Sequence, residues 1–205
     1  MKTFHIFSIV TLGVVCALSN SASATPTVKR SAVRSEHNQK RIIARFGIGG
    51  SAPTQDENDT LDGMGLRIGA TLGYQIPINA RFSVTPQAWL GYSNWSGKNQ
   101  VSSSMFALGA GAQADYFLLE KLSLWAGGAL GGGSVAIEMG SASESKGGFA
   151  LAVEAGATYF LHEHIGVGAF FGVTNVFAGK DEQTQTEFSA TSIDFGVRLR
   201  GTFAL

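Results

Sequence analysis

Few residues of this chain have types that could do catalytic or metal-binding chemistry, and the histidines come first. His162 and His164 flank Glu163 in a short turn, whereas His37 lies in a polar N-terminal stretch. Two imidazoles can bind a metal ion, but a functional metal site usually supplies three or four ligands. The serines of the polar segments have no neighbouring base that would activate a hydroxyl as a nucleophile. We therefore expect no enzyme activity, no metal site and no cofactor.

A cluster of acidic residues between residues 51 and 64 is the second candidate. Its members are Asp56, Glu57, Asp59 and Asp62. Carboxylates at this density could bind calcium, but the segment lacks the mid-loop glycine and the closing glutamate of an EF-hand loop. We therefore interpret the segment as a solvated acidic loop.

The elements that carry these segments follow from an alternation of apolar with small or polar residues, which is typical of β-strands. It covers eight stretches, at residues 42–49, 66–75, 82–91, 106–116, 122–131, 149–159, 165–174 and 192–205. Short connections near 77–80, 118–121 and 161–164 alternate with long polar ones near 51–64, 94–103, 138–147 and 179–189. Short turns at one end and long loops at the other are typical of a transmembrane β-barrel. Because proline cannot donate to the strand ladder, Pro86 predicts a bulge or another local defect.

Composition indicates which face of the strands meets lipid. Charged residues make up only 15% of the 205 residues, against about 25% in an ordinary soluble domain. A soluble barrel, which is the alternative, needs a charged exterior, whereas the second face here is mostly Gly, Ala, Ser and Thr. We therefore predict an all-β fold, an eight-stranded antiparallel up-and-down transmembrane barrel with its apolar face toward lipid. After the first 24 residues, no apolar run approaches the roughly 20 residues of a membrane helix.

Seven charged residues fall on the interior face of the predicted barrel. They are Arg45, Arg67, Asp115, Glu154, Asp194, Arg198 and Arg200. Charges in a narrow interior are costly unless they are paired, so we predict an interior salt-bridge network. Counting residues from the short turns puts Glu154 level with Arg198. The same count puts Arg67 level with Asp194, nearer the long loops, and places Arg45, Arg200 and Asp115 near the short turns.

Two interpretations of this interior network stay open. The side chains plug the barrel, because eight strands barely leave a lumen. Alternatively, they line a narrow gated ion path, for which the many inward glycines would leave free volume.

Five aromatic residues lie beside the short turns or the C-terminus: Tyr74, Phe82, Tyr116, Tyr159 and Phe203. Aromatic side chains at strand ends form girdles at the headgroup level of a membrane. Their position at one shared end predicts that the short-turn end lies at a membrane interface.

The N-terminal segment has the pattern of a secretory signal peptide. An apolar run from Ile6 to Leu18 is followed by the small residues Ala22, Ser23 and Ala24. We predict a signal peptide at residues 1–24, cleaved after Ala24. Residues 25–41 are polar and basic without periodicity, so we expect a flexible periplasmic arm there and a barrel over residues 42–205.

The export signal, the eight alternating strands and the apolar last strand resemble the small outer-membrane β-barrel family. This family includes OmpA-type transmembrane domains and OmpX-like and opacity-type proteins, and its members are often labelled porin family. The resemblance covers about residues 42–205 and implies a Gram-negative outer-membrane protein with both termini in the periplasm. It implies outer-membrane lipid, lipopolysaccharide and the barrel-assembly machinery as partners. Members usually end in an aromatic residue. Phe203 lies on the same strand face as the terminal residue, but the terminal residue itself is Leu205 and departs from the rule.

The charges also bear on function. The formal net charge is zero, with 15 Lys and Arg against 15 Asp and Glu, and gives no sign of a nucleic-acid partner. The four long connections hold three lysines against nine acidic residues, among them Asp181, Glu182 and Glu187. We therefore expect an acidic outer rim that suits cation bridging to lipopolysaccharide or a basic host surface ligand.

Together these features predict a monomer with a structural or surface-interaction role. That role would be envelope integrity, adhesion or host contact through the long extracellular loops. The alternative is a small passive pore. A lipid-modifying enzyme is disfavoured, because no histidine lies in a long connection.

Overall fold

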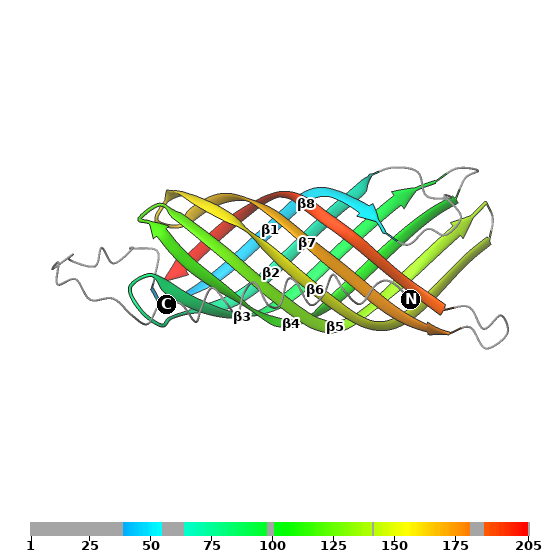
Figure 1. The fold of residues 1–205 in the computed structure, drawn as a ribbon, viewed down its shortest axis with the longest axis horizontal. Coiled ribbons are helices and arrows are strands. Elements are labelled where there is room, and N and C mark those ends of the chain that lie inside the picture. Colours follow the sequence, from blue (N-terminus) through cyan, green and yellow to red (C-terminus); the bar gives the residue numbers. More distant parts are fainter. Residues whose placement is uncertain (1–38, 55–63, 98–100, 141, 181–186, 205) are drawn as a thin grey trace, which may run out of the picture. The chain divides into compact units, whose positions relative to one another are not determined.

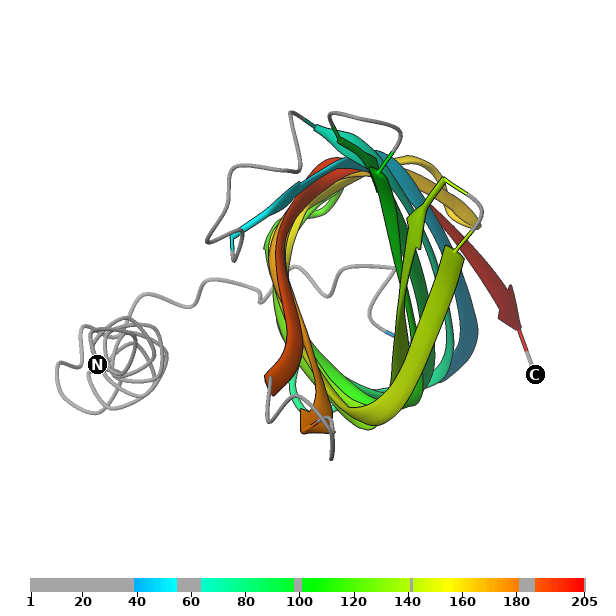
Figure 2. The same ribbon diagram turned by 90° about the vertical axis from the view of Figure 1, so that its right-hand side faces the viewer.

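The structure, a computed structural model, describes residues 39–54, 64–97, 101–140, 142–180 and 187–204. These residues form eight strands: β1 (Arg41–Pro53), β2 (Gly65–Pro77), β3 (Phe82–Ser96), β4 (Val101–Leu119), β5 (Leu122–Met139), β6 (Ala142–His162), β7 (Ile165–Lys180) and β8 (Glu187–Ala204). Each strand pairs antiparallel with the next, and β8 pairs with β1 to close the ring (Figures 1 and 2). The predicted all-β up-and-down barrel is therefore confirmed.

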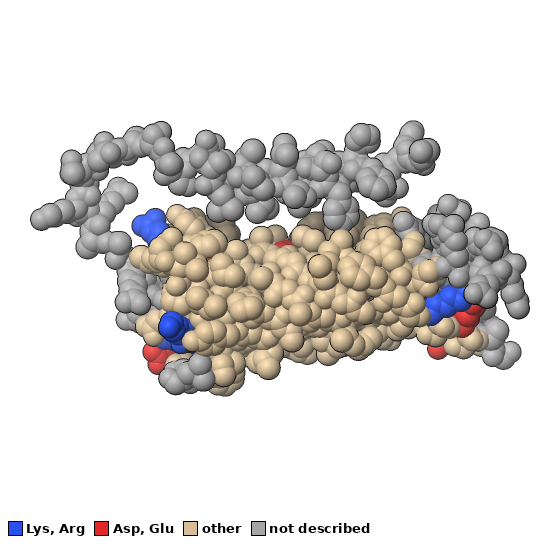
Figure 3. Space-filling view, turned by 90° about the horizontal axis from the view of Figure 1, so that it is seen from below, with Lys and Arg blue, Asp and Glu red and all other residues tan. Residues whose placement is uncertain are grey.

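The alternation of residue types sorts the side chains between the two faces of the wall. Apolar side chains such as Leu72 and Leu108 point outward, with exposed fractions of 59% and 53%. Arg45 and Asp115 point inward and are 4% and 0% exposed. This arrangement is the inverse of a soluble domain and matches a wall surrounded by lipid. Figure 3 shows the result, a nearly uncharged band between two ends that carry the Lys, Arg, Asp and Glu side chains.

The strand register fixes the width of the barrel. Stepping across paired residues from Ile43 leads through Gly73, Gln87, Gly111, Ala129, Ala152, Thr174 and Ser192 and back to β1 at Pro53. Pro53 follows Ile43 by ten residues, which is the shear of the barrel. With about 3.3 Å per residue and about 4.8 Å between strands, this shear tilts the strands by about 40° and gives a radius of about 8 Å. Such a barrel has room inside for side chains only.

All four long connections are shorter than the sequence predicts, and three of them markedly so. The segments between β3 and β4 and between β7 and β8 span residues 97–100 and 181–186, and β5 and β6 are joined by residues 140–141. The strands continue past the end of the apolar alternation, as the pairing of Ser102 with Glu138 shows. Backbone pairing does not need an apolar outer face beyond the lipid-facing band of the barrel. The apolar alternation in the sequence therefore ends before the strands do. Gly140 in the tight β5–β6 turn has a φ of 61°, a conformation that glycine adopts without steric cost.

The strand ladder has irregularities at defined places. The ladder between β2 and β3 omits Tyr74 and Gln75, opposite Thr85 and Pro86, but the register is the same on both sides of the gap. The defect expected at Pro86 is thus a gap and not a bulge. Register shifts occur elsewhere, two of them next to short turns, at Phe117/Leu119 and at Phe160/His162.

The predicted segment boundaries need one correction. β1 begins at Arg41, which the sequence pattern assigned to the arm; its side chain is buried, so the barrel begins one residue earlier. The predicted signal peptide and residues 25–38 of the predicted arm lie outside the described residues. In the described part of the chain, no helix has the length and apolar character needed to cross a membrane.

Candidate functional site

All seven charged residues assigned to the interior face point into the barrel and are buried. We call them the charge layer. Around Asp115, one carboxylate oxygen lies 2.6 Å from Arg200 Nη1 and the other lies 3.6 Å from Arg45 Nη2. Gln113 Nε2 donates to the same carboxylate at 3.2 Å. Asp115 therefore joins β4 to β1 and β8 across the barrel.

Glu154 and Asp194 form the other half of the charge layer. Arg67 Nη2 donates to Glu154 Oε1 at 3.1 Å, and Arg198 Nη2 donates to Glu154 Oε2. Asp194 lies 3.5 Å from Arg67 Nε and accepts from the hydroxyls of Ser51 at 2.6 Å and Thr174 at 2.8 Å. Arg67 thus bridges two carboxylates on different strands.

Aromatic rings fill the space around the arginines, and the sequence reasoning did not single them out. Arg198 contacts both Trp125 and Phe170, with its guanidinium carbon 4.3 Å and 5.1 Å from the ring centroids. Arg67 lies 5.7 Å from the ring centroid of Trp89. Such contacts stabilise a desolvated cation. The sequence signal was the alternation along each strand, which puts all three rings on the interior face. They therefore cannot serve as lipid anchors.

An apolar floor closes the short-turn end of the interior. Phe117 and Phe160, which we call the floor, stack with centroids 6.0 Å apart, directly beside the two register shifts. Arg41 reaches over this end and donates to the backbone carbonyl of Glu163 at 2.8 Å, and Thr202 donates to the same carbonyl at 3.1 Å. The β6–β7 turn is thereby tied to β1 and β8.

An apolar cap closes the long-loop end. It consists of Trp95, Met105, Val135 and Val176, all at most 5% exposed. The indole of Trp95 donates to the carbonyl of Ser51 at 3.0 Å, which fixes the largest side chain of the cap against β1. Smaller side chains of the same cluster, among them Ala107 and Ala150, pack against these four.

Several inward glycines do not leave free volume, which weakens one argument for an ion path. A Cβ at Gly91 would lie 2.5 Å from Arg67 Nη1, and a Cβ at Gly156 would lie 2.6 Å from the Trp125 ring. Large side chains of neighbouring strands therefore occupy the space over these glycines. Two cavities within the charge layer measure about 10 Å³ each, which is room for about one water molecule.

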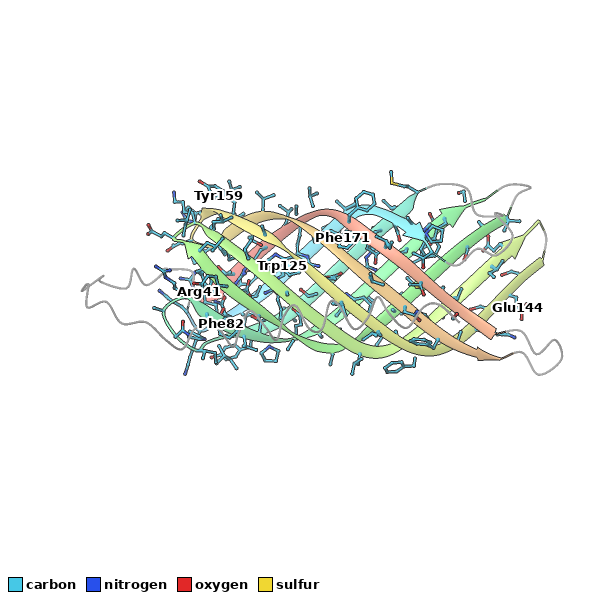
Figure 4. The ribbon with its side chains drawn as sticks, in the orientation of Figure 1. Arg41, Phe82, Trp125, Glu144, Tyr159 and Phe171 are labelled. Atoms are coloured by element: carbon cyan, nitrogen blue, oxygen red, sulfur yellow. The ribbon has the colours of Figure 1, made fainter. Side chains whose placement is uncertain are left out.

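The five aromatic residues expected at the short-turn end lie there, on the outer face. Phe82 pairs with Tyr116 across β3 and β4, and Figure 4 shows Phe82 and Tyr159 at one end of the barrel and Glu144 at the other. Phe203 and Tyr74 flank Ile42 on either side.

A second aromatic girdle, which the sequence reasoning missed, lies toward the long-loop end. It consists of Tyr92, Phe106, Phe149 and Phe177, which pair as Tyr92 with Phe106 and Phe149 with Phe177. These side chains are 38% to 50% exposed on the outer face. The signal was a ten-residue spacing, which separates Phe82 from Tyr92, Tyr116 from Phe106, and Tyr159 from Phe149.

The remaining candidate residues lie near the barrel ends. Most of the acidic loop residues, namely Asp56, Glu57, Asp59, Asp62, Asp181 and Glu182, are outside the described residues, and Glu187 begins β8 opposite Lys180. The rings of His162 and His164 lie 5.9 Å apart, and Glu163 Oε1 is 3.0 Å from His164 Nε2. Among the described residues, no group of three or more His, Cys, Asp and Glu side chains is arranged to hold a metal ion.

Comparison with solved structures supports this architecture. The chain is similar to Neisserial surface protein A, with 15% identity, a TM-score of 0.54, and 80% of this chain and 97% of that chain covered. It is also similar to Ail, the attachment invasion locus protein of Yersinia pestis, in complex with the heparin analogue sucrose octasulfate. That match has 15% identity, a TM-score of 0.50, and 79% and 99% coverage. At these identities the two structures show a shared fold.

Comparison with curated proteins finds no match. Comparison with sequence families gives a more specific result. Residues 12–200 match the sequence profile described as outer membrane protein beta-barrel domain, which is most of the chain. The chain therefore belongs to the outer membrane protein beta-barrel family, whose members lie in the outer membrane of Gram-negative bacteria.

Proposed function

We propose that this protein is a closed outer-membrane barrel that acts through contacts at its long-loop end and conducts no ions. The observation that carries this proposal is the filled interior. The floor, the charge layer and the cap follow one another along the barrel, and two cavities of the charge layer each admit about one water molecule. Packed apolar layers resist wetting, so ions would meet a barrier at both ends.

The shape of the long-loop end supports a role in surface contact. β4, β5 and β6 have 19, 18 and 21 residues, whereas β1 and β2 have 13 each, so the wall is taller on one side (Figure 1). Beyond the second aromatic girdle, the outward residues of these three strands are mostly serines, together with Glu138. A wall of this polarity suits water and headgroups better than acyl chains. It therefore offers a surface to partners outside the membrane.

Charge indicates the class of partner. The four long connections predicted from the sequence hold nine acidic residues against three lysines. Ail was solved with a polyanion bound, but an acidic rim repels polyanions and attracts basic surfaces. We therefore propose a positively charged protein surface as the partner class for adhesion or host contact.

Single-channel recording tests the closed barrel. Purified protein in a planar bilayer should give no conductance steps at any salt concentration, and reconstituted liposomes should not swell in permeant sugars. Discrete, reproducible openings would overturn the proposal and favour the passive pore.

Binding to a polycation tests the surface role. Cells that display the protein should bind polylysine-coated beads, and the binding should weaken when the salt concentration rises. Neutralising Asp181, Glu182 and Glu187 together should reduce bead binding. The matched control neutralises Glu120 and Glu163 at the short-turn end and should leave binding unchanged. Equal binding by both variants would reject the acidic rim as the contact surface.

A further inference from the structure

The charge layer is not neutral. Four arginines, Arg45, Arg67, Arg198 and Arg200, face three carboxylates, those of Asp115, Glu154 and Asp194. Among the described residues between the floor and the cap, one positive charge therefore remains uncompensated. A buried charge without a counter-charge is costly, because the interior has a low dielectric constant and the surrounding wall faces lipid.

A cavity lies next to this excess charge. It measures about 10 Å³ and is lined by Arg45, Arg67, Arg198 and Thr71, with Glu154 at one side. A cavity of this size holds one particle about as large as a water molecule. Polyatomic anions such as sulfate or phosphate do not fit, so an anion bound here would be monatomic.

Three of the residues that line the cavity carry a buried polar atom that has no hydrogen-bond partner among the described residues. These atoms are Arg67 Nη1, Arg45 Nη2 and Thr71 Oγ1. Arg45 Nη2 has a longer ion-pair contact to Asp115, at 3.6 Å. The three residues are at most 6% exposed, so bulk water does not satisfy these donors. Leaving such groups unsatisfied costs about 1 to 3 kcal/mol each.

The strand register explains why these three residues line one cavity. Arg45 and Thr71 are directly paired across β1 and β2, and Arg67 stands four residues from Thr71 on the same inner side of β2. The position between them is Gly69, which has no side chain to fill the space. Among the described residues, Glu154 supplies the one carboxylate at the cavity, and its two oxygens already accept from Arg67 and Arg198.

We propose that this cavity binds one chloride ion. A chloride would accept from the guanidinium and hydroxyl donors and would also cancel the excess positive charge of the layer. A water molecule would satisfy donors but leave the charge. The proposal is independent of the surface role, because the cavity lies within the charge layer and not at the long-loop end.

Bromide substitution tests the site directly. Crystals grown in sodium bromide should show an anomalous peak in the cavity beside Thr71. Thr71→Val, which removes the hydroxyl and keeps the shape, should lose this peak, whereas Thr71→Ser should keep it. The matched control is Thr85→Val, because Thr85 Oγ1 is likewise buried and has no hydrogen-bond partner among the described residues, but Thr85 does not line this cavity. A water molecule without anomalous signal in wild-type crystals would overturn the proposal.

Unfolding in solution gives a second readout. At constant ionic strength, replacing sodium gluconate by sodium chloride should raise the urea midpoint of the wild type and of Thr85→Val, since a ligand that binds only the folded state stabilises it. Thr71→Val should lose this chloride-dependent shift. A shift of equal size in Thr71→Val and Thr85→Val would place the chloride effect elsewhere and overturn the assignment.

Discussion

Tyr159 and Phe149 lie on the same lipid-facing side of β6, ten residues apart, and each belongs to a different aromatic girdle. At about 3.3 Å per residue and a tilt of about 40°, ten residues span about 25 Å along the barrel axis. This is the height of the apolar band of outer-membrane barrels. The same spacing in β3 and β4 therefore marks both edges of the lipid-facing band.

The second girdle contains a testable aromatic pair. Phe149 and Phe177 have ring centroids 6.3 Å apart and an interplanar angle of 26°. Aromatic pairs contribute about 0.5 to 1.5 kcal/mol beyond the burial of area. We expect a double-mutant cycle of Phe149→Ala and Phe177→Ala, measured by urea unfolding in lipid vesicles, to give a coupling energy in that range. Strictly additive single variants would show that the rings anchor the barrel independently of each other.

The charge layer predicts a large penalty for removing one carboxylate. Glu154→Gln would leave Arg67 and Arg198 buried without their shared counter-charge. Breaking a buried pair in this way costs about 3 to 5 kcal/mol. Unfolding followed by tryptophan fluorescence should show this loss. The matched control, Glu144→Gln, removes a half-exposed partner of Lys146 and should cost less than about 1 kcal/mol. Equal losses in the two variants would contradict a buried network.

The sequence predicts the barrel well because lipid imposes a strict period-two pattern on its wall. The interior charges were also readable, since counting residues put Glu154 level with Arg198, and the structure pairs them. Strand ends above the membrane were less readable, because pairs such as Ser102 with Glu138 continue the ladder without an apolar face. The filling of the interior was one of the two interpretations that the sequence left open, because the inward glycines favoured free volume. In a sequence, an inward glycine suggests free volume inside the barrel, but only the structure shows that Trp125 occupies the volume next to Gly156.

This use of glycine leads to a prediction about overpacking. A Cβ at Gly156 would lie 2.2 Å from the carbonyl oxygen of Ala169 and 2.6 Å from the Trp125 ring. Gly156→Ala should therefore destabilise the barrel by about 1 to 3 kcal/mol, the usual cost of overpacking. At Gly132 on β5, the nearest atom to an added Cβ is 3.8 Å away, so Gly132→Ala is the matched control and should be close to neutral. Urea midpoints of the two variants test this, and a neutral Gly156→Ala would mean that both the backbone at Ala169 and the Trp125 ring shift to make room.

The two apolar layers predict how the barrel can be opened. The cap depends on Trp95 and the floor on Phe117, both at most 2% exposed. Either layer alone blocks ions, since a packed apolar constriction resists wetting. Trp95→Ala and Phe117→Ala should therefore each remain silent in planar bilayers.

The double variant should instead show conductance steps. With both apolar layers reduced, water reaches the charge layer from each end and hydrates its guanidinium and carboxylate groups, which compete for water far better than apolar side chains do. A single variant that conducts would show that one layer is the whole barrier. A silent double variant that still folds, as judged by its gel mobility without boiling, would show that the packed charge layer is itself a seal.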